Sequence, residues 1–255
     1  MSDINGLNLT NVIATRSNKK IYRDGNKCIK LFDKGFSKAD VLNEALNLAR
    51  VEETTLNVPK ILEVTMLDGC WAIVYEYVEG KTLTEFIAED PDNIQKYMDM
   101  MIDLQITINE QKCPLLPNLR DKMFRKISLT KFDDAIKYEL NTHLDGMPRH
   151  DKLCHGDFRP SNIVITPDNK SYIIDWSHAT QGNASADIAR TYLVYLLNNQ
   201  KENAEYYLQR YCEKTNTPRV YIERWVRIVA ASQTVKGNAE EIDLLSRMVN
   251  VVDFQ

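Results

Sequence analysis

The side chains with the clearest chemical potential lie in one stretch, Leu153–Asn162, and in a second, Tyr172–Trp176. The first reads LCHGDFRPSN and places a histidine, an aspartate, an arginine and an asparagine within eight positions. The second reads YIIDW and carries a further aspartate. Carboxylate and carboxamide oxygens suit a hard divalent cation. A second carboxylate would then be left to receive a proton, which is the chemistry of phosphoryl transfer.

Two apolar runs are expected to position these side chains. The polar loop is followed by the apolar IVIT, a turn signal at 167–169 (PDN) and the second apolar run. This pattern predicts a β-hairpin. Loop, hairpin and terminal aspartate would bring Asp157, Asn162 and Asp175 to one end of a small sheet.

Short strands dominate the pattern before residue 79. They are predicted over 12–14, 20–22, 27–32, 61–64 and 71–75, with a helix after the N-cap Ser37 that runs to Arg50. Asp-Gly pairs at 24–25 and 68–69 are strong signals for tight hairpins. We therefore expect a small antiparallel sheet with one packed helix, which forms an N-terminal lobe over residues 1–78.

From residue 79 onward the pattern is mostly helical. Beyond the central hairpin, helices are predicted over 186–197, 204–213, 218–235 and 239–252. The change of pattern at Glu79-Gly80 predicts a hinge between the first lobe and a C-terminal lobe over 79–255. The fold class is thus α+β.

Composition excludes several classes of protein. With 255 residues and 44% hydrophobic content, the chain can bury a sizeable core in one domain or two tightly joined lobes. A formal charge of -4 argues against a nucleic-acid binder; it would suit a cationic substrate, although solubility explains it equally well. Five cysteines without a CxxC pair indicate free thiols in a reducing cytosol. No apolar run reaches membrane length and the N-terminus is polar, so we expect a cytoplasmic protein without a membrane partner.

A mostly β segment, a hinge, a helical segment and HGDxxxxN before an apolar-Asp strand form a recognisable set. Over roughly Ile21–Arg190 the sequence resembles the aminoglycoside phosphotransferase and choline kinase family of the protein-kinase-like superfamily. The resemblance implies a two-lobed protein-kinase-like fold and the use of ATP or GTP with Mg²⁺. It makes Asp157 the catalytic base or the group that orients the substrate hydroxyl. It also implies that Asn162 and Asp175 bind the magnesium ion. The alternative is that these residues serve only turns and caps.

The resemblance also implies nucleotide-binding residues in the first lobe. Lys30 matches the strand lysine that contacts the inner phosphates, with Lys27 as a competing candidate, and Glu44 would pair with it. An edge-strand lysine and a solvated helix glutamate are the alternatives. The carbonyl of Glu76 and the amide of Val78 would bond adenine at the hinge.

One part of the family pattern is missing. No glycine occurs in 8–23, so a Gly-rich phosphate loop is absent. The amides of Ser17 and Asn18 would have to cover the phosphates instead. Lys19 and Lys20 could add positive charge there.

Three further residues of the loop region have two interpretations each. His155 could be a general base, but the resemblance favours a packing and hydrogen-bonding support. Arg159 would neutralise charge on the transferred phosphate, as a catalytic group, or is an exposed loop arginine. Asp187 would brace the catalytic loop or act only as a charge at a helix N-terminus.

The segment 175–187 is too short for the activation segment with which protein kinases dock peptides. The sequence therefore predicts a kinase that moves the γ-phosphoryl group to a hydroxyl of a small polar or cationic molecule, similar to an aminoglycoside, choline or a sugar. The alternatives are an atypical protein serine/threonine kinase, a non-catalytic nucleotide-binding pseudokinase, and an unrelated α+β protein with a coincidental motif. Aromatic residues that share helical faces could form a cage for a quaternary ammonium or simply pack the core: Tyr192, Tyr195, Tyr207, Tyr211 and Trp225.

Overall fold

The computed structural model describes residues 3–4 and 6–250. The chain packs into two compact units: unit 1 comprises Met1–Glu89 and Pro160–His178, and unit 2 comprises Asp90–Arg159 and Ala179–Gln255. Unit 1 therefore takes in a segment from the middle of the chain. The division into a nucleotide-binding part, 1–78, and a catalytic part, 79–255, concerns function and stays a prediction.

Unit 1 is built on a five-stranded antiparallel sheet with the strand order β3-β4-β5-β7-β6. Its strands are β3 (Val12–Arg16), β4 (Lys19–Asp24), β5 (Lys27–Phe32), β6 (Ile61–Leu67) and β7 (Cys70–Glu76). All five expected strands are present. The turn between β6 and β7 has Asp68 at a φ of 48° and Gly69 at a φ of 77°. Positive φ at both central residues is the geometry for which an Asp-Gly pair is selected.

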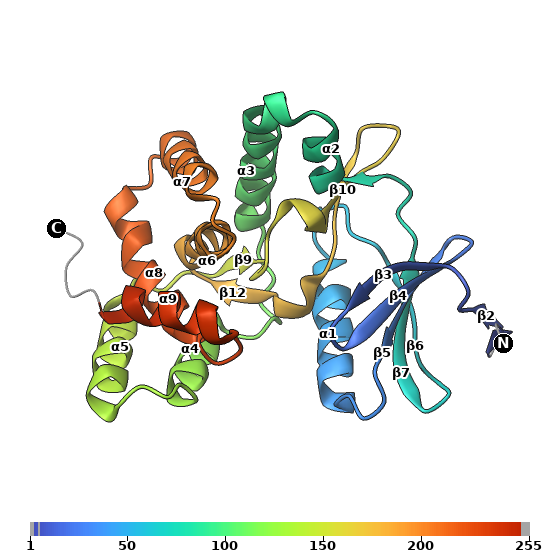
Figure 1. Ribbon diagram of the computed structural model, residues 1–255, viewed down its shortest axis with the longest axis horizontal. Helices are drawn as coiled ribbons and strands as arrows, with labels where there is room; N and C mark the ends of the chain where they lie inside the picture. The colour runs from blue at the N-terminus through green and yellow to red at the C-terminus, as the bar shows by residue number, and fades with distance from the viewer. Residues whose placement is uncertain (1–2, 5, 251–255) are drawn as a thin grey trace. The chain divides into compact units, whose positions relative to one another are not determined.

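One helix, α1 (Lys38–Val51), covers one face of this sheet (Figure 1). The hydroxyl of Ser37 accepts a hydrogen bond from the amide of Asp40 and so caps the helix as expected. A core of buried side chains joins helix and sheet: Phe32, Val41, Ala45 and Ile73. A second cluster packs on the sheet with help from the short strand β2 (Leu7–Asn8), which pairs with β1 (Asp3–Ile4): Leu7, Tyr22, Ile29, Leu67, Ala72 and Val74.

The central hairpin forms a second, three-stranded antiparallel sheet within unit 1. Its strands are β8 (Lys81–Thr82), β10 (Ile163–Ile165) and β11 (Ser171–Ile173), in the order β11-β10-β8. Short 3-10 turns flank the hairpin: η2 (Pro160–Asn162) and η3 (Trp176–His178). After β8 comes α2 (Leu83–Glu89), where Thr82 and Glu85 bond each other's main-chain amides in a capping box. The expected hairpin is thus confirmed, and its pairing with β8 explains why 160–178 belongs to unit 1.

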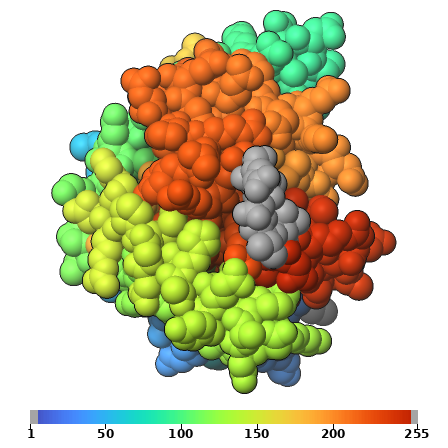
Figure 2. Space-filling view, turned by 90° about the vertical axis from the view of Figure 1, so that its left-hand side faces the viewer, coloured from blue at the N-terminus to red at the C-terminus, as the bar shows by residue number. Residues whose placement is uncertain are grey.

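Unit 2 is mainly helical. Its helices are α3 (Ile94–Glu110) after η1 (Pro91–Asn93), α4 (Leu119–Ser128), α5 (Asp134–Gly146), α6 (Ala184–Leu197), α7 (Lys201–Thr215), α8 (Arg219–Gln233) and α9 (Ala239–Asn250). Figure 2 shows the face of this unit on which α7 and α8 (orange) and α9 (red) lie at the surface. A short antiparallel ladder joins β9 (Lys152–Cys154) to β12 (Thr180–Gly182). The four helices expected after the hairpin are present, and the predicted end of the last, at 251–252, lies outside the described residues.

The fold class is α+β, as expected. All five cysteines are free thiols. None of the helices in the described ranges is long and apolar enough to cross a membrane.

Substituting Gly80 with alanine should destabilise unit 1. Gly80 has a φ of 157°, and a Cβ there would lie 2.3 Å from the carbonyl oxygen of Ile165. Because that oxygen belongs to the backbone of β10, we expect Gly80→Ala to lower the free energy of unfolding by about 1–3 kcal/mol in urea denaturation. Gly146→Ala, at the end of α5, is the matched control, since its Cβ would enter open space. Equal free energies of unfolding for Gly80→Ala and the wild-type protein would contradict the packing described.

Candidate active site

Three charged side chains of unit 1 meet beside the sheet. Lys30 extends from β5, Glu44 from α1, and Asp175 follows β11. The Nζ atom of Lys30 donates to Oε1 of Glu44 and lies 3.2 Å from Oδ1 of Asp175. The side chain of Lys30 is only 7% exposed, against 15% for Glu44 and 31% for Asp175. Three elements distant in the sequence thus converge on one buried ammonium.

The electrostatic surroundings keep Lys30 protonated. Burial alone would lower its pKa, because it penalises the charged form. Tyr75, Asp175 and Glu44 outweigh burial and raise the pKa of Lys30 well above its ordinary value. The site therefore holds a fixed positive charge.

The hairpin places the two expected metal ligands at the same end of the small sheet. The carbonyl oxygen of Asn162 accepts from the amide of Ile174, at 2.9 Å, directly before Asp175 in the chain. Asp175 adopts a φ of 63°, in the left-handed region that a non-glycine residue seldom occupies. The hydroxyl of Ser177 donates to its Oδ1 at 3.1 Å. Backbone strain of this kind concentrates at functional sites.

The donor types of Asn162 and Asp175 fit magnesium. A carboxylate and a carboxamide supply hard oxygen ligands, which Mg²⁺ combines with water and phosphate oxygens. No cluster of three His, Cys, Asp or Glu side chains suited to a metal occurs in the described part of the chain. A magnesium ion at these two residues would complete its coordination with water and phosphate oxygens.

The other expected nucleotide contacts lie elsewhere in unit 1. Ser17 and Asn18 are exposed and form the turn between β3 and β4, where the carbonyl of Asn18 accepts from the amide of Asp33. Glu76 ends β7, and Val78 lies in the segment that follows. Among the described contacts, none of these four expected residues joins the ion pairs of Lys30. Their roles toward phosphate and adenine stay predictions.

Unit 2 holds the other conspicuous carboxylate, Asp157, which is 7% exposed. Arg159 donates to its Oδ2 through Nε at 3.1 Å and also through Nη2. Arg190, on α6, donates to its Oδ1 at 3.3 Å. Burial alone would raise the pKa of Asp157, but the two guanidinium groups hold it below its ordinary value. Asp157 is therefore a carboxylate at neutral pH.

The loop that carries Asp157 is braced by Asp187. This buried carboxylate, on α6, accepts from the amides of His155 and Gly156 at 3.1 and 2.7 Å, and from the side chain of Gln105 at 3.3 Å. The ring of His155 accepts through Nδ1 from the amide of Asp157 and packs edge-on against Phe158. These contacts match the supporting roles expected for His155 and Asp187.

Arg190 is a site residue that the sequence reading missed. A signal was available, because Asp187 and Arg190 are three residues apart and share a face of the predicted helix. Further cations lie nearby on α4. Burial lowers the pKa of Lys126 to about 8, and the positive charge of Arg190 acts in the same direction. Lys126 thus lies near Arg190, which is itself a partner of Asp157.

The aromatic residues considered for a cation cage mostly belong to the helical core. Tyr195, Tyr207, Tyr211 and Trp225 are each less than a tenth exposed. Tyr192 donates its hydroxyl to Glu205 at 2.9 Å. Core packing accounts for these positions.

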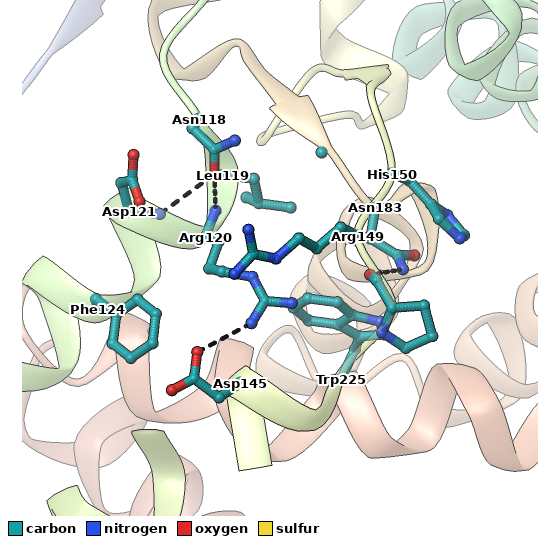
Figure 3. Close-up of a pocket in the computed structure, with 12 residues that line it drawn as sticks. Asn118, Leu119, Arg120, Asp121, Phe124, Asp145, Arg149, His150, Asn183 and Trp225 are labelled. Atoms are coloured by element: carbon teal, nitrogen blue, oxygen red, sulfur yellow. Dashed lines mark hydrogen bonds and ion pairs between the residues drawn. The ribbon is translucent and has the colours of Figure 1, made fainter. Parts of the chain in front are cut away.

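Unit 2 also has a pocket of about 340 Å³, lined from α4, α5, α8 and the segment 148–150 (Figure 3). The guanidinium of Arg120 lies at this pocket and binds Asp145 and the carbonyl of Leu144. The candidate cage residue Trp225 lines the pocket, whereas none of the expected catalytic, nucleotide-binding or metal-binding residues does. The pocket is therefore distinct from the candidate active site.

Comparison with known proteins identifies the family. Residues 11–222 match the sequence model of the phosphotransferase enzyme family. The chain belongs to this family. A "Protein LicA homolog" from Mycoplasma capricolum subsp. capricolum is 30% identical over 145 residues, which are 55% of this chain and 58% of that relative. The chain thus matches little more than half the length of this curated relative.

Solved structures of family members share the fold. Aminoglycoside phosphotransferase APH(4)-Ia has a TM-score of 0.66 at 15% identity, with 93% of this chain and 90% of that chain covered. Choline kinase LicA from Streptococcus pneumoniae has a TM-score of 0.62 at 18% identity, with coverages of 94% and 93%. These likenesses confirm the protein-kinase-like α+β fold.

Removing the Asp187 carboxylate should destabilise the protein. In Asp187→Ala the buried amides of His155 and Gly156 lose their shared acceptor, so we expect the free energy of unfolding to fall by at least about 2 kcal/mol. Urea denaturation measures this change. Asp134→Ala, at the exposed first turn of α5, serves as the control and should cost less than about 1 kcal/mol. A loss for Asp187→Ala no larger than that of the control would show that the brace contributes little.

Proposed function

We propose that this protein is a kinase that transfers the γ-phosphoryl group of ATP or GTP to a hydroxyl of a small molecule. The observation that carries the proposal is the buried Lys30 ammonium, which is fixed between Glu44 and Asp175. A buried cation flanked by a strained aspartate is suited to hold a phosphate chain and its metal together. Similar proteins support nucleotide binding, since a thermostable mutant of APH(4)-Ia was solved with AMP-PNP and hygromycin B, and LicA was solved with AMP.

Each expected site residue has a distinct role in this proposal. Lys30, oriented by Glu44, binds the inner phosphates, and Asn162 and Asp175 hold magnesium, which supplies charge neutralisation when it is bound. Asp157 accepts the proton of the acceptor hydroxyl or orients that hydroxyl for attack on the γ-phosphorus. The ionised state of Asp157 suits both tasks, because a carboxylate can accept a hydrogen bond from the hydroxyl.

The guanidinium of Arg159 stabilises negative charge that develops on the transferred group. The main-chain groups of Glu76 and Val78 bond the adenine or guanine base, and the amides of Ser17 and Asn18 lie toward the phosphates. Residues 1–78 then supply most of the nucleotide contacts and residues 79–255 most of the catalytic ones.

The acceptor is proposed to be a small polar molecule with a free hydroxyl. The names of the relatives suggest aminoglycosides, choline and similar compounds, which are cationic. In this chain three of the four candidate cage tyrosines are buried in the core. The guanidinium groups of Arg159 and Arg190 face Asp157 with positive charge. Hydroxyl compounds with neutral and anionic groups therefore belong in any acceptor screen beside the cationic ones.

Nucleotide consumption against a panel of acceptors tests the proposal. The panel comprises aminoglycosides that include hygromycin B, choline, ethanolamine, neutral sugars and hydroxy acids, with Mg·ATP and Mg·GTP as donors. We expect one acceptor class to stimulate turnover, and Asp157→Asn to lower kcat by about 10²- to 10⁴-fold because it removes the carboxylate that receives the proton.

Asp151→Asn is the matched control for this substitution. Asp151 lies in the same unit but on the surface, where it pairs with Lys112, so its loss should leave kcat unchanged. Acceptor-dependent turnover that survives in Asp157→Asn would remove Asp157 from the mechanism. Failure of the wild-type protein to bind either Mg-nucleotide would overturn the proposed function.

A further inference from the structure

A second lysine of the sheet lies beside the Lys30 ion cluster. The Nζ atom of Lys19 is 3.9 Å from Oε2 of Glu44, while Lys30 binds Oε1 of the same carboxylate. The side chain of Lys19 is only 18% exposed. This is low for a lysine, since lysines are mostly exposed. One glutamate therefore faces two ammonium groups.

Strand register explains why Lys19 points inward. Lys19 pairs with Phe32 across β4 and β5, and Ile21 pairs with Lys30. Side chains of paired residues lie on the same face of a sheet, and every second residue of a strand shares that face. Lys19 therefore lies on the face that carries Lys30 and Phe32, which is the face covered by α1. The neighbouring Lys20, which the sequence also offered as a source of charge at the phosphates, pairs with Leu31, lies on the opposite face and is exposed, so it is no part of the ion cluster.

The turn that precedes Lys19 fixes where its strand begins. Ser17 and Asn18 form this turn, and the carbonyl of Asn18 accepts from the amide of Asp33 at 3.0 Å. The ammonium of Lys19 lies 5.8 Å from the centre of the Phe32 ring, within range of a cation–π contact. The backbone bond holds the residue before Lys19 in place, and the ring contact holds its ammonium near Phe32.

The charged cluster would carry an excess of positive charge once a magnesium ion is bound. Two ammonium groups, Lys19 and Lys30, face two carboxylates, Glu44 and Asp175. If Asp175 holds a magnesium ion, Glu44 is the carboxylate that remains for both lysines. Burial and the nearby charge of Lys30 lower the pKa of Lys19 by more than Glu44 and Asp175 raise it. The oxygens of a phosphate chain would supply the missing negative charge.

We propose that Lys19 is a second phosphate-binding lysine, which contacts the phosphate chain of the nucleotide beside Lys30. In other nucleotide-binding proteins the main-chain amides of a glycine-rich loop bind the phosphates. This chain has no glycine in 8–23, and the ammonium of Lys19 then provides part of that phosphate binding. This inference rests on the proposed nucleotide-binding function and adds a residue to that site.

Binding of ATP, ADP, AMP and adenosine to Lys19→Met and Lys20→Met tests the proposal. Calorimetric titration with excess Mg²⁺ gives each Kd, and methionine preserves most of the apolar stem of the lysine. We expect Lys19→Met to weaken ATP binding about 10- to 100-fold, with a smaller loss for AMP and none for adenosine. Lys20→Met, one residue away on the opposite face of the sheet, should bind all four ligands as the wild-type protein does. Lys19→Arg should restore most of the ATP affinity.

Three results would overturn the proposal. An equal loss for adenosine and ATP would mean that Lys19 only supports the structure around Glu44. Unchanged ATP affinity in Lys19→Met would remove Lys19 from the phosphate site while the nucleotide-binding function stands. Absence of nucleotide binding by the wild-type protein would overturn the underlying function and this inference together.

Discussion

Burial of one ammonium group, that of Lys30, is the constraint on which the structure of unit 1 depends. A charge taken out of water is stable only with close counter-charges, and removal of one partner from a buried pair costs about 3–5 kcal/mol. The partners of Lys30 come from α1 and from Asp175, the second residue after β11. Sheet, helix and hairpin must therefore all be in place before the charge is compensated.

In unit 2 the buried charges are negative, and they too are stable only with close compensating partners. Its two buried carboxylates, Asp157 and Asp187, are compensated in different ways. Two guanidinium groups face Asp157, which keeps it ionised, whereas Asp187 uses backbone amides and fixes the shape of the loop. One carboxylate is thus available for chemistry, and the other holds the loop in position.

Much of this could be predicted from the sequence because the signals are local. Short apolar runs and Asp-Gly turns located the five strands, and the polar run before IVIT located the loop and the hairpin. The spacing of HGDxxxxN and the apolar-Asp strand pointed to a family whose membership the comparison with known proteins confirms. Asn162 and Asp175 lie at one end of the hairpin because its register requires it.

The parts that escaped prediction depend on tertiary contacts. Lys19 and Lys20 were both candidates for adding charge beside the phosphates, and only the approach of Lys19 to Glu44 separates the two. Arg190 is likewise distinguished by its contact with Asp157. The inclusion of 160–178 in unit 1 follows from strand pairing with β8, a two-residue strand too short to recognise by periodicity. Asp175 shares its left-handed conformation with Asp68 and three asparagines, and residue type alone does not tell which aspartates adopt it.

The central claim is that the Lys30 ammonium, oriented by Glu44, is a nucleotide-phosphate site. Its most direct test is the Kd of Mg·ATP for Glu44→Gln, measured by calorimetric titration beside the wild-type protein and Glu53→Gln. Glu53 is an exposed glutamate just after α1 and provides the matched charge change. We expect Glu44→Gln to weaken Mg·ATP binding by about tenfold or more, because Lys30 loses its counter-charge. Glu53→Gln should bind Mg·ATP as the wild-type protein does. Equal affinity of Glu44→Gln and the wild-type protein for Mg·ATP would contradict the central claim.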